Sequence, residues 1–545
     1  EEFKPIEPGK VRIYCCGPTV YNYFHIGNAR PFIVFDTLRR YLEHKGYEVK
    51  YVQNFTDIDD KMIRRANEEG ITVKELGDRF IKEYYTDADA LGIERATVNP
   101  RATEHIADII ALIEKLIDKG LAYACDNGDV YYNTQAFPGY GKLCGQNLED
   151  LESGARIDVD PNKRHPMDFA VWKAQKPGEP AWESPWGMGR PGWHIECSAM
   201  SMKYLGETLD IHCGGKDLVF PHHENEIAQS EGATGKPFVH YWMHNGFINV
   251  DNQKMSKSLG NFFTVRDIAK EFDLEAVRMF MLGAQYRSPI NFSREMIEQA
   301  KASLDRLYTA RDHYLFLLQN AKDGELGEKE LALLEKVKAA REGFDEAMDD
   351  DLNTADAVSV IFELVRAINI AVEKTPTKAL AQACLEMLHE FTQVLGLLYQ
   401  KKEGEESLDA KVEAMIQARQ AARKEKNGRF KLYLSELYGR RSDLIYDCEG
   451  KAVTPYIITN NLWDIQGVKQ YRFIQEDVRD YTIWLNGDPE AMDREEILRR
   501  IRPYLGEEAR IKVEIVDEIP VLASGKRKYI ENRCEKYQQH KGFCG

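Results

Sequence analysis

Apolar and polar positions near the N-terminus follow the pattern of a strand, a helix and a second strand. Residues 11 to 16 form a short β-rich run that ends at Gly17-Pro18, as a buried strand does. Between Ala29 and Gly46 the apolar residues recur at helical spacing, and residues 48 to 55 return to a strand pattern. A βαβ unit of this kind favours a parallel sheet with ligands at the carboxyl ends of its strands.

Further along the chain the pattern changes twice. Residues from about 98 to 190 are rich in Asp, Gly and Pro and hold only short strand-like pieces, which is typical of an insertion. Strand patterns resume at residues 208–212 and 246–250, and the chain from about 265 to 400 is mostly helical. One apolar face of a bundle helix is formed by Ile361, Leu364, Val365, Ile368 and Val372.

The pattern changes again after a charged linker at residues 401–406 and a helical stretch that ends near residue 426. From Tyr471 onward it predicts two strands, a helix and a further strand, which together suggest a small α+β domain. We therefore predict an α/β protein of three domains. These are a Rossmann-like parallel-sheet catalytic domain at residues 1–265 with its insertion at about 98–190, a helical bundle at 266–427 and a small α+β domain at 428–545.

Composition limits the class of protein. The length of 545 residues and the apolar content of 43% suffice for several packed cores and exclude a disordered or fibrous chain. There are 89 acidic and 73 basic residues, and residues 428–545 are balanced in charge, so the excess acid lies upstream. A protein that binds nucleic acid with its whole surface is therefore excluded, whereas a local basic groove is not.

Three further features bear on the location of the protein. The sequence has no apolar run of transmembrane length and no secretory-signal pattern, so we expect no membrane association and a cytoplasmic location. Its 10 cysteines lack framework spacing, which indicates reduced thiols, a few of which could bind a metal or react. The first residue is Glu1 rather than Met, which leaves room for residues upstream.

The first group of candidate chemical residues lies between the first strand and the first helix. It comprises Cys16-Gly-Pro-Thr-Val-Tyr21 and His25-Ile-Gly-Asn28. Gly27 at the start of a helix lets the backbone approach a ligand closely, and the helix N-terminus attracts phosphate. The alternative is a histidine that is only solvated or capping.

The second group has the spacing of metal ligands. His222 and Glu226 are four residues apart and would share one helical face. Cys16 and Cys197 would complete a site with two sulfurs, one nitrogen and one oxygen. In the alternative interpretation, His222 caps a helix and both cysteines are core thiols. Rival ligands that spacing leaves open are His212, Cys213 and His223.

The third group is Lys254-Met-Ser-Lys257-Ser258. Two lysines in a loop with small hydroxyl residues can neutralise a polyphosphate while its charge moves to the leaving group. Such loops are also common on ordinary surfaces, so the specificity of this one comes from its position after the other two groups.

Together these residues carry a resemblance. His25-Ile-Gly-Asn28 and Lys254-Met-Ser-Lys-Ser258 look like the two signatures of class I aminoacyl-tRNA synthetases. Longer motifs resemble the cysteinyl-tRNA synthetase family over residues 1 to about 427. They are Cys16-Gly-Pro-Thr-Val-Tyr21, Asn54-Phe-Thr-Asp-Ile-Asp-Asp-Lys61, Arg190-Pro-Gly-Trp-His-Ile-Glu-Cys-Ser-Ala-Met200 and Phe220-Pro-His-His-Glu-Asn-Glu-Ile-Ala-Gln-Ser230.

The resemblance implies roles for individual residues. One zinc ion per chain would be held by Cys16, Cys197, His222 and Glu226. The amino-acid pocket would be lined by Thr56, Trp193 and Asp217. ATP, with Mg²⁺, would be engaged by His25, Asn28 and Lys257, and Lys254 would join these three in catalysis. Asn28 stands where the signature usually has histidine, and asparagine can still donate a hydrogen bond to phosphate.

The implied activity is ATP-dependent activation of L-cysteine to cysteinyl-adenylate and transfer of cysteine to tRNA(Cys). Zinc would select cysteine, because a metal held by two thiolates, a histidine and a glutamate prefers a thiolate to the hydroxyl of serine. One alternative is a ligase that transfers activated cysteine to a small amine or carrier, as a related mycothiol-pathway ligase does. Another is a non-catalytic RNA-binding or regulatory protein. The sequence does not indicate an oligomeric state.

The C-terminal part resembles a different family. Its motifs are Gly439-Arg-Arg-Ser-Asp443, Val453-Thr-Pro-Tyr456 and Ile519-Pro-Val-Leu-Ala-Ser-Gly-Lys-Arg-Lys528. They are similar to the small C-terminal domain of adenylate-forming enzymes of the phenylacetate-CoA ligase and capsule-biosynthesis type. The resemblance implies that Lys526 contacts an adenylate and that the segment near Asp443 is a hinge. The large domain of such ligases is absent here, so we expect Lys526 to have no adenylate of its own.

Overall fold

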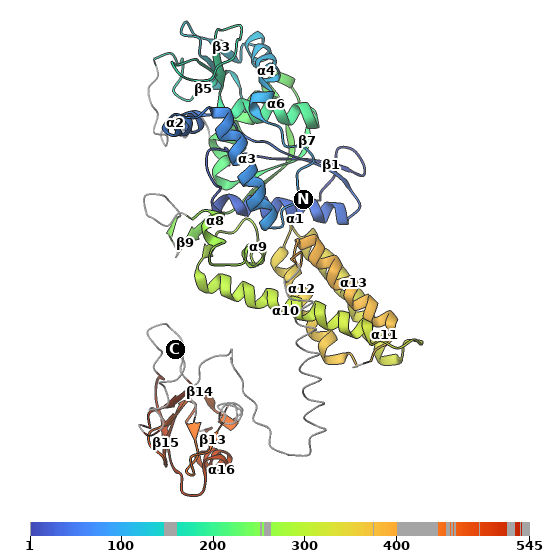
Figure 1. Cartoon of the computed structure of the whole chain (residues 1–545), viewed down its shortest axis with the longest axis vertical. Coiled ribbons are helices and arrows are strands. Elements are labelled where there is room, and N and C mark those ends of the chain that lie inside the picture. The colour runs from blue at the N-terminus through green and yellow to red at the C-terminus, as the bar shows by residue number, and fades with distance from the viewer. Residues whose placement is uncertain are drawn as a thin grey trace. The chain divides into compact units, whose positions relative to one another are not determined.

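A computed structural model describes residues 2–145, 161–250, 253–254, 263–373 and 375–400 and, with short gaps, 445–536. The chain forms two compact units, Glu1–Val412 and Glu413–Gly545 (Figure 1). Within the described ranges, none of the helices combines the length and the apolar character that a membrane span requires.

The first unit is built on a four-stranded parallel sheet in the order β2-β1-β7-β8. Its strands are β1 (Lys10–Cys15), β2 (Glu48–Gln53), β7 (Leu209–Gly215) and β8 (Val239–Asn245). Helix α1 (Ile26–His44) connects β1 to β2 and packs its apolar side chains into the main core. The predicted βαβ unit and the Rossmann-like parallel sheet are thus confirmed.

Two further helices follow β2, namely α2 (Asp60–Glu69) and α3 (Val73–Ala90). The chain then forms a separate antiparallel sheet in the order β3-β4-β5-β6, with a hydrophobic core of its own. Helix α4 (Ile106–Asp118) precedes this sheet. The strands are β3 (Ala122–Ala124), β4 (Val130–Tyr132), β5 (Phe169–Ala174) and β6 (Gly189–Pro191). This sheet lies within the segment predicted to be an insertion, between β2 and β7 of the parallel sheet.

The chain returns to the parallel sheet through α6 (Trp193–Leu205), and α7 (Glu224–Thr234) lies between β7 and β8. A small three-stranded sheet follows, in which β9 (Ile248–Val250) pairs with β10 (Gln253–Lys254) and with β11 (Ile290–Phe292). Helices α8 (Val265–Ile268) and α9 (Leu274–Leu282) lie between β10 and β11 in the sequence.

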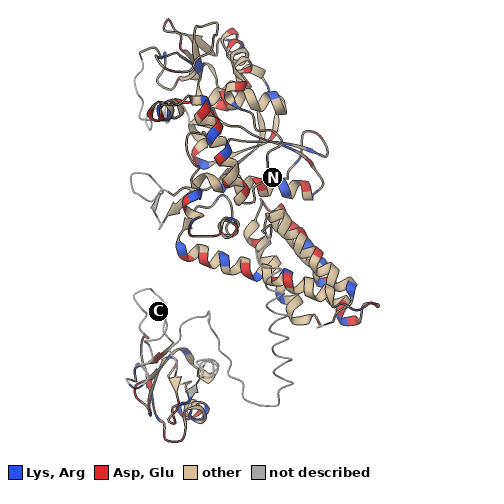
Figure 2. Ribbon diagram, viewed as in Figure 1, with Lys and Arg blue, Asp and Glu red and all other residues tan. Residues whose placement is uncertain are grey.

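The helical bundle consists of α10 (Arg294–Gln319), α11 (Glu328–Asp349), α12 (Thr354–Ala371) and α13 (Lys378–Leu395). Acidic and basic residues are interspersed along these helices (Figure 2). Of the predicted apolar face, Ile361, Leu364, Val365 and Ile368 are buried. Val372 is partly buried just beyond the end of α12. The predicted bundle is therefore confirmed.

A buried arginine joins the end of the bundle to α1. Arg278 donates through Nε to the backbone oxygen of Leu395 at 2.8 Å and through a terminal nitrogen to Asp36 Oδ2 at 2.5 Å. Asp36 lies in the middle of α1. Gly396 ends α13 with a φ of +62°, and a Cβ atom there would overlap the Arg278 guanidinium. The close approach of the end of α13 to Arg278 of α9 therefore requires glycine at position 396.

The second unit contains a sheet in the order β16-β15-β14-β17. Its elements are a short hairpin of β12 (Ile445–Tyr446) and β13 (Ala452–Val453), then β14 (Val468–Gln475), β15 (Asp480–Gly487), α16 (Arg494–Leu505), β16 (Arg510–Ile515) and β17 (Ile530–Asn532). Ile497, Ile501 and Leu505 of α16 share a core with the sheet. The predicted α+β pattern is confirmed, whereas Asp443 and Lys526 lie outside the described residues.

Two glycine substitutions test the contact at the end of the bundle. Gly396 and Gly235 both end helices in the left-handed region, but only Gly396 has a neighbour in the way of a Cβ atom. We expect Gly235→Ala to lower the free energy of unfolding by about 1 kcal/mol through backbone strain alone. Gly396→Ala should lower it by about 3 kcal/mol because the Arg278 contacts must also shift. Urea unfolding of the full chain measures both, and equal losses would contradict this account of Gly396.

Candidate metal centre and active site

Four ligand-type side chains from three separate segments meet at the carboxyl end of the parallel sheet. Cys16 follows β1, Cys197 lies in α6, His222 lies in the turn before α7, and Glu226 lies in the first turn of α7. Their ligand atoms all lie within 4.8 Å of one another. None of the four residues is more than 8% exposed, so the cluster is shielded from water.

The contacts within this group, which we call the Cys16 cluster, are close. Cys16 Sγ lies 4.0 Å from Cys197 Sγ and 3.6 Å from Glu226 Oε1. His222 Nε2 lies 2.9 Å from the same Glu226 oxygen. Two sulfurs, an imidazole nitrogen and a carboxylate oxygen form a donor set that zinc prefers, so these residues fit a zinc ion.

Outer partners orient two of the four donors. His222 Nδ1 lies 2.9 Å from His194 Nδ1, and Glu226 Oε2 lies 2.8 Å from His212 Nε2. Metal-binding histidines and carboxylates are usually held in this way by a second layer of hydrogen bonds. The outer partners therefore support the fit of the Cys16 cluster to a metal.

A second group of four overlaps the first. Cys16 and Glu226 also lie within 4.8 Å of His212 and His223 through their ligand atoms. His223 Nε2 is 3.4 Å from Cys16 Sγ. The structure thus brings two of the rival histidines to the same place, while Cys213 on β7 belongs to neither group.

Electrostatics favour a cation at the Cys16 cluster. Although burial opposes the ionisation of Glu226, the charges of His212 and His222 hold its pKa well below its usual value. A hydrogen bond from Cys16 lowers the pKa of the Cys197 thiol to about 6, whereas burial raises the pKa of Cys16. A carboxylate and a thiolate therefore stand ready to bind a positive ion.

The three residues predicted to line the amino-acid pocket lie on segments near the Cys16 cluster. The Trp193 ring packs against the His222 ring with centroids 4.4 Å apart and an interplanar angle of 33°, and Trp193 is 43% exposed. Thr56 follows β2 and is buried, and its backbone bonds with Pro18 and Val20 in the loop after Cys16. Asp217 is exposed in the short turn Lys216–Leu218, just before the segment that carries His222. All three residues therefore lie on segments that adjoin the cluster.

Sequence reasoning missed Glu196, which lies next to Cys197. Glu196 is fully buried, and its Oε2 accepts a hydrogen bond from Thr56 Oγ1 at 3.0 Å. Its Oε1 has no hydrogen-bond partner among the described residues, and burial raises the pKa of this carboxyl well above its usual value. A lone acidic residue between Trp193 and Met202 was the available signal.

The first signature stands at the N-terminus of α1. His25 is the N-cap residue in an extended conformation, and its backbone oxygen accepts from the Asn28 N–H at 2.9 Å. The backbone N–H of Ile26 donates to the oxygen of Phe263 at 3.1 Å, and that of Val265 donates to Phe24. The segment that follows the second signature therefore runs directly beside the first.

The second signature is described only in part. Lys254 lies on β10, where its backbone pairs with Asn249 of β9. The side chain of Lys254 and all of Lys257 lie outside the described residues.

A buried cation that sequence reasoning missed connects the two signatures. Arg30 lies two residues after Asn28 and is fully buried. It donates to the backbone oxygens of Gly246 at 2.8 Å and Phe247 at 3.1 Å, immediately before β9. A lone arginine within the apolar stretch of α1 was the only signal in the sequence. The hairpin that carries Lys254 is thus attached to the helix that carries the first signature.

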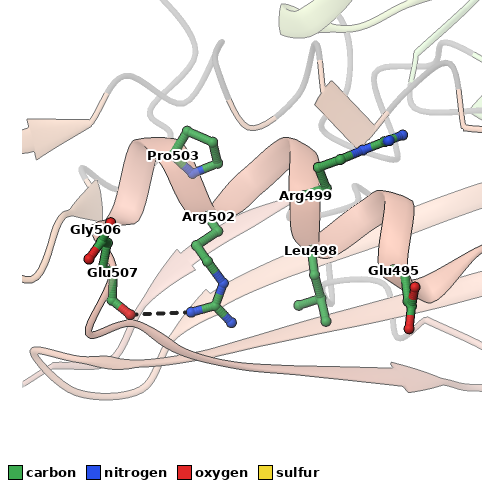
Figure 3. A pocket seen from close by; sticks show the side chains of 7 residues that line it. All are labelled: Glu495, Leu498, Arg499, Arg502, Pro503, Gly506 and Glu507. Atoms are coloured by element: carbon green, nitrogen blue, oxygen red, sulfur yellow. Dashed lines mark hydrogen bonds between the residues drawn. The ribbon is translucent and has the colours of Figure 1, made fainter.

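A surface hollow also runs along α16 of the second unit (Figure 3). It is lined by Glu495, Leu498, Arg499, Arg502, Pro503, Gly506 and Glu507. One terminal nitrogen of Arg502 donates to the backbone oxygen of Glu507 at 3.3 Å. The hollow has no thiol or imidazole lining residue, so its chemistry differs from that of the Cys16 cluster.

Comparison with protein families finds matches to three parts of the chain. Residues 2–302 match the class I (C) tRNA synthetase catalytic domain, residues 343–400 match the DALR domain, and residues 445–533 match the CapK C-terminal domain. The cysteine–tRNA ligase of Clostridioides difficile (strain 630) is 61% identical over 426 residues, which are 78% of this chain and 91% of that protein.

Solved structures share the fold at low sequence identity. Mycobacterium tuberculosis methionyl-tRNA synthetase in complex with methionyl-adenylate has a TM-score of 0.52 and 16% identity, and the match covers 71% of this chain and 89% of that one. The ternary complex of Agrobacterium radiobacter K84 agnB2 LeuRS with tRNA and LeuAMS has a TM-score of 0.54 and 12% identity, over 86% and 95% of the two chains.

Proposed function

The chain belongs to the cysteine–tRNA ligase family of class I aminoacyl-tRNA synthetases, and from this premise we propose how its residues perform the reaction. It activates L-cysteine with ATP and charges tRNA(Cys). Transfer to a small amine or carrier is not favoured, because the identity to a cysteine–tRNA ligase extends over 426 residues and the bundle carries a DALR domain.

Selection of cysteine is the first task. Cysteine and serine differ by one atom, and an apolar pocket separates such neighbours by only ~1–3 kcal/mol. The Cys16 cluster supports a stronger mechanism, with Cys16, Cys197, His222 and Glu226 as ligands of a zinc ion. When bound, zinc supplies a soft centre that prefers a thiolate to a hydroxyl.

Other side chains orient the amino acid beside the cluster. Trp193 packs against His222 and is exposed enough to cover a bound ligand. Thr56 has a hydroxyl near the buried Glu196, and Asp217 offers a carboxylate that can attract the substrate ammonium group. The observation that carries this proposal is the meeting of two thiols, an imidazole and a carboxylate beside an exposed indole ring.

Adenylate formation follows at the two signatures. A carboxylate oxygen of cysteine attacks the α-phosphorus of ATP. The bond between this phosphorus and the oxygen that bridges it to the β-phosphorus breaks, and pyrophosphate leaves with Mg²⁺. His25 and Asn28 hold phosphate at the N-terminus of α1, where the helix dipole favours negative charge. Lys254 and Lys257 neutralise the charge that develops on the leaving group.

Transfer to tRNA completes the reaction. The hydroxyl of the 3′-terminal adenosine attacks the carbonyl carbon of the adenylate, and AMP leaves. Positioning of the two reactants of each step accounts for both adenylate formation and transfer, without a covalent enzyme intermediate. We assign this work to the cytoplasm because the substrate is a tRNA.

Purified protein should exchange pyrophosphate into ATP in a cysteine-dependent manner and should form cysteinyl-tRNA(Cys). Replacing cysteine by serine should lower the exchange at least ~100-fold, which is more than an apolar pocket provides. Labelled pyrophosphate and acid-precipitable aminoacyl-tRNA are the two measurements. The assigned activity would be wrong if protein loaded with zinc showed neither.

Two lysine substitutions separate the proposed ATP site from the C-terminal unit. Lys257→Ala should lower the rate of cysteine-dependent exchange by about 100-fold, because a charge that stabilises the leaving group is lost. Lys526→Ala removes the lysine that matches the adenylate contact of the other family and should change the rate less than twofold. A large effect of Lys526→Ala would show that the C-terminal unit takes part in adenylation.

Zinc content distinguishes the two overlapping groups of ligands. His222→Asn should weaken zinc binding by more than the ~10- to 100-fold typical of a lost outer partner, because it removes a ligand. For His223→Asn, the loss of zinc affinity should stay within this ~10- to 100-fold range. Metal per chain, measured by mass spectrometry after dialysis against graded chelator, gives the comparison. The reverse order would identify the alternative group of Cys16, His212, His223 and Glu226 as the site.

A further inference from the structure

The turn between α11 and α12 has an unusual backbone. Asp351 and Leu352 follow one another in the left-handed region, with φ values of +57° and +56°. Neither is glycine, so this conformation costs free energy and persists only where surrounding contacts enforce it. Leu352 is buried in the core, and the Asp351 side chain is 33% exposed. The turn thus directs one partly exposed carboxylate toward the catalytic part of the unit.

The Asp351 carboxylate holds three consecutive residues of that part. Its Oδ1 accepts from the Tyr286 hydroxyl at 3.0 Å, and its Oδ2 accepts from Gln285 Nε2 at 3.2 Å. A terminal nitrogen of Arg287 lies 2.6 Å from Oδ2. Since these residues come directly after α9 and before β11, a single bundle residue fixes the connection between them.

The same three residues support the region before β9. The backbone oxygen of Tyr286 accepts from the Gly246 N–H at 2.8 Å, and the oxygen of Gln285 accepts from Arg30 at 3.3 Å. Arg30 in turn holds the oxygens of Gly246 and Phe247. A Cβ atom at Gly246 would overlap the backbone of residues 287 and 288, so the two segments lie in direct contact.

A continuous set of hydrogen bonds therefore runs from the bundle to α1, two residues past the first signature, and to the residues immediately before β9. It passes from Asp351 to residues 285–287, and from there to Gly246 and Arg30. We propose that Asp351 is a positioning residue for adenylate formation, which fixes the β9–β10 hairpin relative to α1 and so sets the geometry of ATP binding. This inference rests on the proposed function, because it takes the two signatures as the ATP site.

Kinetics of three variants test the proposal. Asp351→Gly removes the carboxylate, and glycine accepts the left-handed conformation without strain, so thermal unfolding should not shift downward. In cysteine-dependent pyrophosphate exchange, the KM for ATP should rise about tenfold, a usual size for coupling between sites, while the KM for cysteine stays constant. Asp351→Asn keeps one acceptor oxygen and should give a smaller rise. Asp350→Asn, at the exposed neighbour, should leave both constants unchanged.

A double-mutant cycle adds an independent measurement. Tyr286→Phe removes the hydroxyl that donates to Asp351 and keeps the ring in the core. Alone it should raise the KM for ATP, and in the Asp351→Gly background it should add little, because the two residues act through one contact.

Two results would overturn the proposal. One is an unchanged KM for ATP in Asp351→Gly. The other is an equal rise of both KM values together with a lower unfolding temperature, which would indicate a merely structural role. Absence of exchange in the unsubstituted protein is a separate result, since it would refute the proposed function before any variant is compared.

Discussion

The structure of the catalytic part depends on one constraint, which is that the four ionisable side chains of the Cys16 cluster are buried together. Cys16, Cys197, His222 and Glu226 are nearly inaccessible to water, and buried charges are tolerated only when they are paired or bind a metal. Because the central sheet is parallel, the chain leaves β1 and β7 at the same edge, and in the register Cys15 pairs with Cys213. The sheet thus brings the donors together, and His194 and His212 hold two of them in place.

Helix α1 is the element that the two parts of the first unit share. Its N-terminus carries His25 and Asn28, and further along it Asp36 receives the buried guanidinium of Arg278, which also holds the end of α13. Arg30, between these points, donates to backbone oxygens before β9. Buried arginines suit this role, since their fixed fork of donors can satisfy several carbonyls at once. The bundle, the first signature and the hairpin of the second signature are therefore attached to one rigid helix.

Sequence patterns predicted the βαβ unit, the bundle and the small α+β domain, because burial on one face leaves a regular apolar period. The sequence patterns also identified the four candidate ligands, but they left His212 and His223 as alternatives. His222 and Glu226 do meet at 2.9 Å, as their spacing of four predicts, although His222 lies in a π-helical turn before α7. The alternatives remained because His212 reaches the same carboxylate from β7 and His223 reaches Cys16, and neither contact is visible in the spacing. Arg30 and Glu196 were missed because a single charged residue in the sequence does not reveal its partners, which for Arg30 lie 216 residues away or more. The roles of Lys257 and Lys526 remain predictions, outside the described residues.

The separation of the ligands along the chain has a consequence for biosynthesis. Cys16 and Glu226 are 210 residues apart, and the antiparallel sheet of the insertion is translated between them. At about 5–20 residues per second, the Cys16 thiol waits on the ribosome for roughly 10–40 s before its last partner emerges. During that interval it has neither the shielding nor the neighbours of the folded site. Uptake of the proposed zinc ion would therefore come late in the synthesis of the chain, and a reducing environment would keep this thiol intact until then.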